Sequence, residues 1–344
     1  MKYLLILKII ILKILRLNIS FLKREISGYP ESVKNFEKNF ANYIGKKHGI
    51  TFCNGTSSIE AAIYALDLTI GDEILVPSST FHAGIGPIKN LNFKPIFVDI
   101  DEKTLTIDCI DLEKKITNRS KCVLIVHPWG YPCNMNEVVR IIKKNNIKLI
   151  EDCSHAHGAT YDKKKVGSFA DISCFSLQGN KSVAAGEGGI SLTNNNDYLL
   201  RMSIYGHFNR FKDELINHND FLKFAKTGLS KKLRANPLGI SIAAVDLANL
   251  DKINYEKHKI YQKIDQILAK YKFISTMQVN EKAIRGGFFG GYPIILNNLS
   301  NIKEIEENFK NSKIRLLPNP WMQHHKMEVY NKEECILKNT EDLD

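Results

Sequence analysis

The sequence contains no pair of cysteines with CxxC spacing, so it offers no zinc or iron–sulfur pattern. Its seven cysteines are an odd number, and several lie in apolar runs such as Ser173-Cys174-Phe175. A free cysteine in such a run behaves as a small hydrophobic residue. No metal site is therefore predicted, and a reducing cytoplasm is the expected location.

The first 22 residues lack the uninterrupted apolar core of a secretory signal or a membrane span. A span needs about 20 mostly apolar residues, and Lys8, Lys13 and Arg16 interrupt this stretch. No small-residue cleavage site is clear either. A basic and apolar helix can lie on a membrane surface or pack on the protein's own body. For residues 1–24 three interpretations stay open: packing on the body, peripheral membrane contact, and a membrane anchor.

Acidic residues are absent from the first 24 positions, and this accounts for more than half of the net charge. The chain carries +11 in total, and six of these charges come from Lys2, Lys8, Lys13, Arg16, Lys23 and Arg24. The small excess on the remaining residues does not indicate a nucleic-acid partner. It would suit an anionic small substrate.

Internal repeats and long linkers are also absent, and the overall composition is that of a globular protein. The chain has 344 residues, of which 44% are hydrophobic and 25% charged. This length suggests two domains, or one large domain with a smaller partner.

Short apolar strands alternate with helical stretches from about residue 28. A first helix carries Phe36, Phe40 and Ile44 at helical spacing and stops at Gly45, and a second is expected over 59–68. The expected strands are 49–52, 73–77, 95–99, 122–127, 148–152 and 172–175. This alternation predicts an α/β fold with a mostly parallel sheet, in which ligands bind at the carboxyl ends of the strands.

The pattern changes after residue 240. Helices are expected over 240–250 and 253–271, and an apolar strand over 292–296 follows a cluster of four glycines, Gly286, Gly287, Gly290 and Gly291. We therefore predict a basic apolar extension at 1–27, a large domain at 28–245 and a smaller α+β domain at 246–344.

The segment 151–193 is the richest in chemically useful residues. Asp152 and Ser176 each end an apolar strand, so both side chains should emerge at the active edge of the sheet. A polar turn then leads to Lys181 and to the glycine-rich run 186–189. Burial lowers the pKa of a lysine, and a neutral amine can attack an aldehyde to form a Schiff base. Pyridoxal phosphate requires such a lysine, an acidic partner for its ring nitrogen and a phosphate cup.

The run Asn54-Gly55-Thr56-Ser57-Ser58 supplies a candidate for that cup. It lies between an expected strand and an expected helix, where backbone N–H groups and hydroxyls bind phosphate. Each signal is weak alone: Lys181 could be a surface lysine, Asp152 a cap or ion-pair partner, and this run a simple helix cap. Together they predict a pyridoxal-phosphate site.

The chain resembles the DegT/DnrJ/StrS aminotransferases, which act on keto-sugars, usually nucleotide-linked, and have the fold type I architecture of pyridoxal-phosphate enzymes. The resemblance covers about residues 28–260, and more loosely continues to about 325. The motifs that carry it are Gly55-Thr56-Ser57, Pro77 to Ala83, Pro95 to Asp99, Val126 to Gly130, Glu151 to Ala159, Phe175 to Lys181, and Gly186-Glu187-Gly188-Gly189.

The resemblance implies roles for individual residues. Thr56, Ser57 and Ser176 would contact the cofactor phosphate, and Asp152 would hold the ring nitrogen. By the same resemblance, Lys181 would form the Schiff base and move the proton during catalysis. Phe81 would stack on the pyridine ring. His155 stands where the family usually has glutamine, and it could donate to the ring hydroxyl in the same way.

The resemblance also implies a homodimer with shared active sites, in which Asn236 of the softer match Lys232 to Leu238 would reach the partner's cofactor. The resemblance further implies that the amino donor is glutamate. The final helical region expected after Glu333 is short.

Two other hypotheses remain. A related sugar dehydratase would carry histidine in place of Lys181, and a non-catalytic binding or regulatory protein could have kept the fold.

Overall fold

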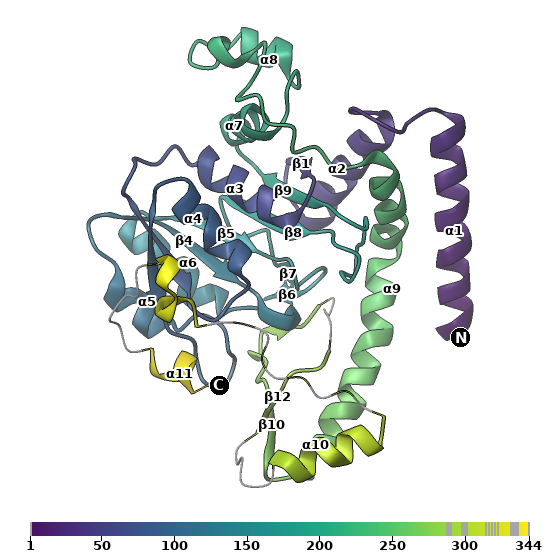
Figure 1. Cartoon of the computed structure of the whole chain (residues 1–344), viewed down its shortest axis with the longest axis vertical. Helices are drawn as coiled ribbons and strands as arrows, with labels where there is room; N and C mark the ends of the chain where they lie inside the picture. The colour runs from purple at the N-terminus through teal and green to yellow at the C-terminus, as the bar shows by residue number, and fades with distance from the viewer. Residues whose placement is uncertain are drawn as a thin grey trace.

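The computed structural model describes residues 2–286, 291–296, 302–313, 323–330 and 337–342, and the single residues 315, 317, 319 and 321. Within these residues the centre of the molecule is a seven-stranded sheet in the order β1-β9-β8-β5-β4-β2-β3 (Figure 1). Its strands are β1 (His48–Phe52), β2 (Glu73–Pro77), β3 (Lys94–Val98), β4 (Ser120–Val126), β5 (Lys148–Asp152), β8 (Ile172–Ser176) and β9 (Gly189–Thr193). Only β9 is antiparallel to its neighbours, β1 and β8, so the predicted α/β fold with a mostly parallel sheet is confirmed.

Helices cover both faces of this sheet. One face packs against α3 (Gly55–Ala65), α4 (Gly86–Asn90) and α7 (Asn196–Gly206). The other face packs against α2 (Glu31–Ile44), α5 (Cys109–Lys115), α6 (Met135–Asn145) and the first turns of α9 (Pro237–Leu268). The short α8 (Lys212–Ile216) lies beyond α7 at the top of the view (Figure 1).

Several predicted boundaries are confirmed, and two are wrong. The strands over 73–77 and 148–152 match β2 and β5, and α2 ends before Gly45, whose φ of 89° is left-handed. The helix expected over 59–68 begins earlier, because Asn54 caps it and Gly55 already belongs to its first turn. The two helices expected over 240–250 and 253–271 are one helix, α9, since neither glycine nor proline interrupts residues 240–268.

The C-terminal part contains a two-stranded sheet of β10 (Ile274–Thr276) and β12 (Ile294–Leu296), with α10 (Ile302–Asn311) beside it. β11 (Ala283–Ile284) instead pairs with β6 (Thr160–Tyr161), which also pairs with β7 (Lys164–Lys165). The last described helix, α11 (Lys338–Glu341), returns to the large sheet, where Thr340 donates to Asp99. The domain boundary at 245/246 lies inside α9 and stays a prediction, and Gly287 and Gly290 lie outside the described residues.

The N-terminal helix α1 (Lys2–Leu22) lies along α9 (Figure 1). Lys13 pairs with the buried Asp246 at 2.8 Å, and the hydroxyls of Ser20 and Ser241 lie 2.8 Å apart. Asp246 also accepts the N–H of Ala184 at 3.2 Å. The interpretation that residues 1–24 pack on the body is therefore confirmed. Among the described residues, no helix has both the length and the apolar character needed to cross a membrane.

Removal of the Lys13 charge should destabilise the protein in a pH-dependent way. Burial raises the pKa of Asp246 and Lys13 opposes this effect, so Lys13→Met should raise the pKa further. The ionised carboxylate then keeps only the Ala184 N–H and loses its ion-pair partner, so the loss in unfolding free energy should reach about 1–3 kcal/mol at neutral pH. The loss should shrink as the pH falls and Asp246 becomes protonated. Urea unfolding at neutral and acidic pH measures it, with the exposed Lys8→Met as control, and equal losses at both pH values would contradict the assignment.

Candidate active site

The residues predicted to bind phosphate meet where α3 begins. The side chain of Asn54 caps this helix by accepting the Ser57 N–H at 2.8 Å. A Cβ added to Gly55 would lie 2.9 Å from Cβ of Ser176, so the helix start abuts the end of β8. Thr56 and Ser57 lie in this first helical turn. The structure thus brings the three hydroxyl residues to one helix N-terminus, the usual protein site for a phosphate.

The glycine-rich turn packs against the same helix cap. A Cβ added to Gly189 would lie 2.3 Å from the carbonyl oxygen of Asn54, so this position has no room for a side chain. Gly186 has a φ of +83°, which glycine adopts without steric cost. Its carbonyl accepts the N–H of Gly179 at 2.7 Å and closes the loop between β8 and β9. This loop carries Lys181.

Lys181 is half-buried, and its charge state is set by two opposing effects. Burial lowers the pKa of its ammonium to about 8, and the negative charge of Asp152 works in the opposite direction. A substantial fraction of the side chain is therefore neutral near physiological pH, as a nucleophilic or basic amine requires.

Asp152 is the last residue of β5 and is only 6% exposed. Burial raises the pKa of its carboxyl, whereas the Ser154 N–H, which donates to Oδ1 at 3.0 Å, and the charge of Lys181 lower it. The two residues predicted to act on the cofactor are therefore within electrostatic reach of each other.

His155 has one tautomer that fits its surroundings. Burial and the charge of Lys181 hold the pKa of its imidazole well below the usual range, so the ring is neutral. Its Nδ1 accepts the backbone N–H of Trp129 at 3.3 Å, so the proton belongs on Nε2. Trp129 itself has a left-handed φ of 44°. His155 is thus a donor through Nε2, and its predicted contact with the cofactor hydroxyl stays a prediction.

Sequence reasoning missed an aromatic stack beside His155. The rings of Trp129 and Trp321 are stacked with centroids 4.0 Å apart, and Trp321 also stacks on His155 at 5.7 Å. Trp321 arrives from the far end of the chain, because His325 binds the Ser78 hydroxyl at 2.7 Å. Local patterns cannot place two residues separated by nearly 200 positions. The only hint of this stack in the sequence is that the chain has just two tryptophans.

Phe81 and Asn236 lie at more open positions. Phe81 is 52% exposed on the loop after β2, next to the buried Thr80. Asn236 is exposed and caps α9, since its side chain accepts the Leu238 N–H at 2.9 Å. Within one chain Asn236 therefore has a structural role, and its contact with a partner's cofactor stays a prediction. Phe81 likewise stays a predicted stacking residue.

A buried cluster behind the site is better explained by structure than by a metal. His127, Glu151 and Cys153 place potential ligand atoms within 4.8 Å of one another. However, the Glu151 carboxylate accepts backbone N–H groups of residues 167, 169 and 170, and Nδ1 of His127 accepts that of Cys133. Burial also raises the pKa of Cys153 to about 12, which disfavours the thiolate a metal would need.

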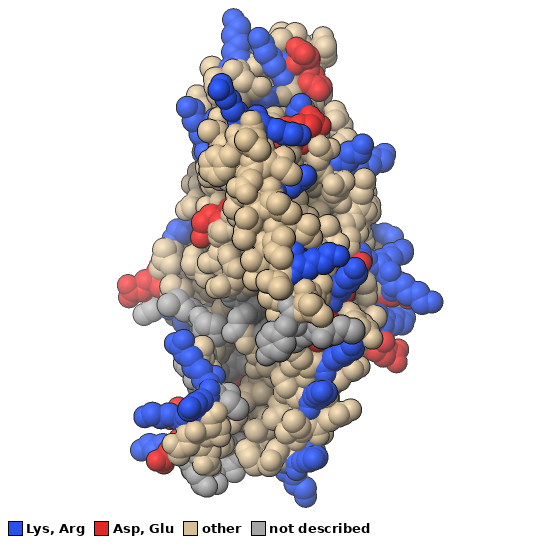
Figure 2. Space-filling view, turned by 90° about the vertical axis from the view of Figure 1, so that its right-hand side faces the viewer, with Lys and Arg blue, Asp and Glu red and all other residues tan. Residues whose placement is uncertain are grey.

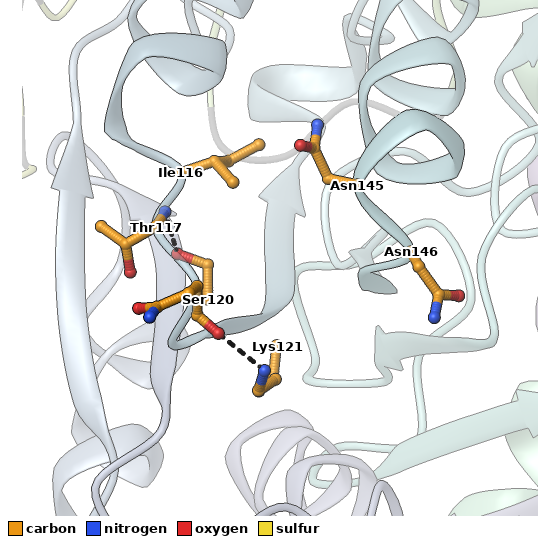
Figure 3. Close-up of a pocket in the computed structure, with 7 residues that line it drawn as sticks. Ile116, Thr117, Ser120, Lys121, Asn145 and Asn146 are labelled. Atoms are coloured by element: carbon orange, nitrogen blue, oxygen red, sulfur yellow. Dashed lines mark hydrogen bonds between the residues drawn. The ribbon is translucent and has the colours of Figure 1, made fainter.

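A cavity of about 430 Å³ lies at the amino end of β4 (Figure 3). It is lined by Ile116 and Thr117 of the preceding loop, by Ser120 at the start of β4, and by Asn145 and Asn146 at the end of α6 (Figure 3). It contains none of the predicted site residues, and ligands of parallel sheets bind at the other edge. We assign it no function.

The sequence pattern of the DegT/DnrJ/EryC1/StrS aminotransferase family matches residues 21–343. The chain belongs to this family. GDP-perosamine synthase of Escherichia coli O157:H7 is 41% identical over 169 residues, which are 49% of this chain and 46% of that protein. GDP-perosamine synthase of Vibrio cholerae is 32% identical over 272 residues, 78% of this chain and 69% of that protein. The chain thus spans about half to two thirds of the length of these relatives.

Solved structures agree on the fold. A GDP-4-keto-6-deoxymannose-3-dehydratase mutant with bound GDP-perosamine superposes with a TM-score of 0.85 at 24% identity, over 97% of this chain and 91% of that one. An aminotransferase from Psychrobacter cryohalolentis gives a TM-score of 0.84 at 22% identity, over 96% and 89%. Both likenesses confirm the fold type I architecture.

The aminotransferases of this family depend on pyridoxal phosphate, and the residues present fit that cofactor. The close approach of Gly55 to Ser176 offers a candidate anion cup. Asp152 ends β5, and Lys181 lies in the loop after the neighbouring strand β8, close enough for its charge to act on Asp152. The Thr80 hydroxyl beside Phe81 is buried and finds no hydrogen-bond partner among the described residues, so a polar group remains to be satisfied at this edge.

The pKa of Lys181 predicts how apoprotein captures the cofactor. Covalent capture requires the neutral amine, so its rate should rise about tenfold per pH unit below about 8 and level off above it. Borohydride reduction followed by mass spectrometry of the Lys181 peptide measures this rate. Asp152→Asn removes the charge that favours the ammonium and should move the midpoint to lower pH. A midpoint near the usual lysine value, or capture on another peptide, would contradict the assignment.

Proposed function

We propose that this protein is a pyridoxal-phosphate-dependent aminotransferase that moves an amino group from an amino acid, expected to be glutamate, to a keto-sugar. The sugar would be nucleotide-linked, and the reaction would serve surface-polysaccharide or amino-sugar biosynthesis. The observation that carries the proposal is the half-buried Lys181, with a pKa of about 8, within reach of the buried Asp152.

The chain's own residues have distinct tasks in this proposal. The N–H groups of the first turn of α3, with Thr56, Ser57 and Ser176, would hold the phosphate. Asp152 would keep the ring nitrogen protonated, and His155 would donate from Nε2 to the ring hydroxyl. When bound, the cofactor supplies an electron sink for charge that develops at the substrate carbon. Lys181 would hold the cofactor and then, as an amine near its pKa, take a proton from that carbon and return it.

The substrate class rests on the relatives. Two GDP-perosamine synthases and a dTDP-3-amino-3,6-dideoxy-alpha-D-galactopyranose transaminase are among the similar proteins, the last at 35% identity over 66% of this chain. These names describe enzymes that act on sugars carrying a nucleotide.

A sugar dehydratase is the alternative, because two similar structures are such enzymes. The fold does not separate the two reactions. By the family resemblance, dehydratases carry histidine where this chain has Lys181, and a histidine cannot hold the cofactor covalently. Lys181 therefore favours amino transfer over both dehydration and a non-catalytic role.

We also propose a cytoplasmic homodimer with shared sites. Asn236 is exposed at the start of α9, and the first turn of that helix contacts the Lys181 loop, since a Cβ on Gly239 would lie 2.3 Å from the carbonyl oxygen of Ala185. A partner subunit that docks at this helix start would lie close to the loop that carries Lys181.

Glutamate alone should test the activity without knowledge of the sugar. Added to cofactor-loaded protein, it should change the cofactor absorbance and release 2-oxoglutarate in one half-reaction. Asp152→Asn should still bind cofactor but slow this step roughly 100-fold to 1,000-fold, because stabilisation of developing charge is lost. The exposed carboxylate variant Asp213→Asn is the control. If glutamate, glutamine, aspartate and alanine all leave the absorbance of loaded protein unchanged, the aminotransferase proposal is wrong.

A further inference from the structure

One side of α1 is apolar and uncovered. Leu4, Leu7, Ile11, Ile14, Leu15 and Leu22 are each between 49% and 84% exposed, and they recur at the three- and four-residue spacing that places them on one helix face. Single exposed hydrophobic side chains are normal on a protein surface, but a continuous row of this kind marks a site of interaction.

The opposite side of α1 is occupied by the protein itself. Ile9, Leu12 and Leu17 are half-buried and Ser20 is buried, and this side follows α9. Lys13 on the same side is fixed to Asp246 at 2.8 Å. The helix is therefore held along the body with its apolar face directed outward. Bound to the body in this way, it would meet a partner side-on along about 30 Å of its length.

The charges around this face have one sign. Lys8 and Arg16 are exposed on α1, Lys23 and Arg24 follow it, and Glu25 is the first acidic residue of the chain. Figure 2 views the side of the molecule on which α1 lies and shows a largely tan surface with more Lys and Arg than Asp and Glu around it. A second copy of α1 would oppose like charges without an acidic partner in residues 1–24. An anionic lipid surface offers acyl chains to the apolar row and counter-charges to its basic flanks.

We propose that the outward face of α1 is a docking surface for an anionic membrane, with the helix lying in the membrane plane between the bilayer and α9. The proposal stands independently of the catalytic activity, because none of the cofactor-site residues belongs to α1.

Vesicle flotation tests this surface. Purified protein of residues 1–344 should float with vesicles of equal parts phosphatidylcholine and phosphatidylglycerol, and much less with phosphatidylcholine alone or at high salt. The double variant Ile11→Glu/Ile14→Glu should abolish flotation, whereas Ile70→Glu, at a 74% exposed position outside α1, should leave it unchanged. Lys8→Gln/Arg16→Gln should reduce flotation several-fold, with the exposed pair Lys163→Gln/Lys164→Gln as the matched control.

Two further measurements keep the result decisive. Thermal unfolding of each variant should show a melting temperature close to that of the unchanged protein, since the substituted side chains are exposed. Light scattering should give the same mass for the protein and for the Ile11→Glu/Ile14→Glu variant. A mass that falls in this variant would mean that a second copy covers α1, and the proposal would be wrong. It would be equally wrong if the unchanged protein stayed out of the anionic vesicle fraction.

Discussion

The site depends on the close approach of three backbone segments at the carboxyl edge of the sheet. Gly55 begins α3 against Ser176, and Gly189 begins β9 against Asn54, with no room for a side chain at either glycine. These contacts hold the two ends of the β8–β9 loop against the helix N-terminus. Since Lys181 lies in that loop, the same contacts that shape the anion cup also determine where the amine lies. The position of the candidate phosphate site and the position of the Lys181 amine are therefore fixed by the same contacts.

At this edge of the sheet, burial and neighbouring charges have opposite effects on the ionisation of Asp152 and Lys181. Asp152 and Lys181 are both removed from water, which disfavours the charge of each, and each charge partly restores the other. For His155 the two effects act in the same direction, because burial and the Lys181 charge both lower the pKa of its imidazole and so disfavour its charged form. One half-buried lysine thus helps to keep a carboxylate ionised and an imidazole neutral within the same site.

The sequence was sufficient for features that repeat locally. Apolar runs identified β2 and β5 to the residue, and the expected positions of Asp152 and Ser176 at the ends of two strands are confirmed. The sequence was insufficient where contacts between distant residues determine the structure. Asn54 starts α3 early by capping it, and the apolar α1 finds its place through Asp246, more than 230 positions away. The docking of Trp321 against His155 depends on His325 and Ser78, a contact that no local spacing encodes. The prediction of two helices within α9 was wrong, because a change in composition does not by itself interrupt a helix.

The pairing of Trp129 with Trp321 has an optical consequence. These are the only two tryptophans of the chain, and they stack on each other beside His155. Nearly all the intrinsic indole emission of the protein must therefore originate at one spot on the carboxyl edge of the sheet. One of the two rings belongs to the strand-loop framework and the other to the returning C-terminal segment, so their emission reports whether that segment is seated. Tryptophan emission thus follows the docking of the C-terminal segment without any added label.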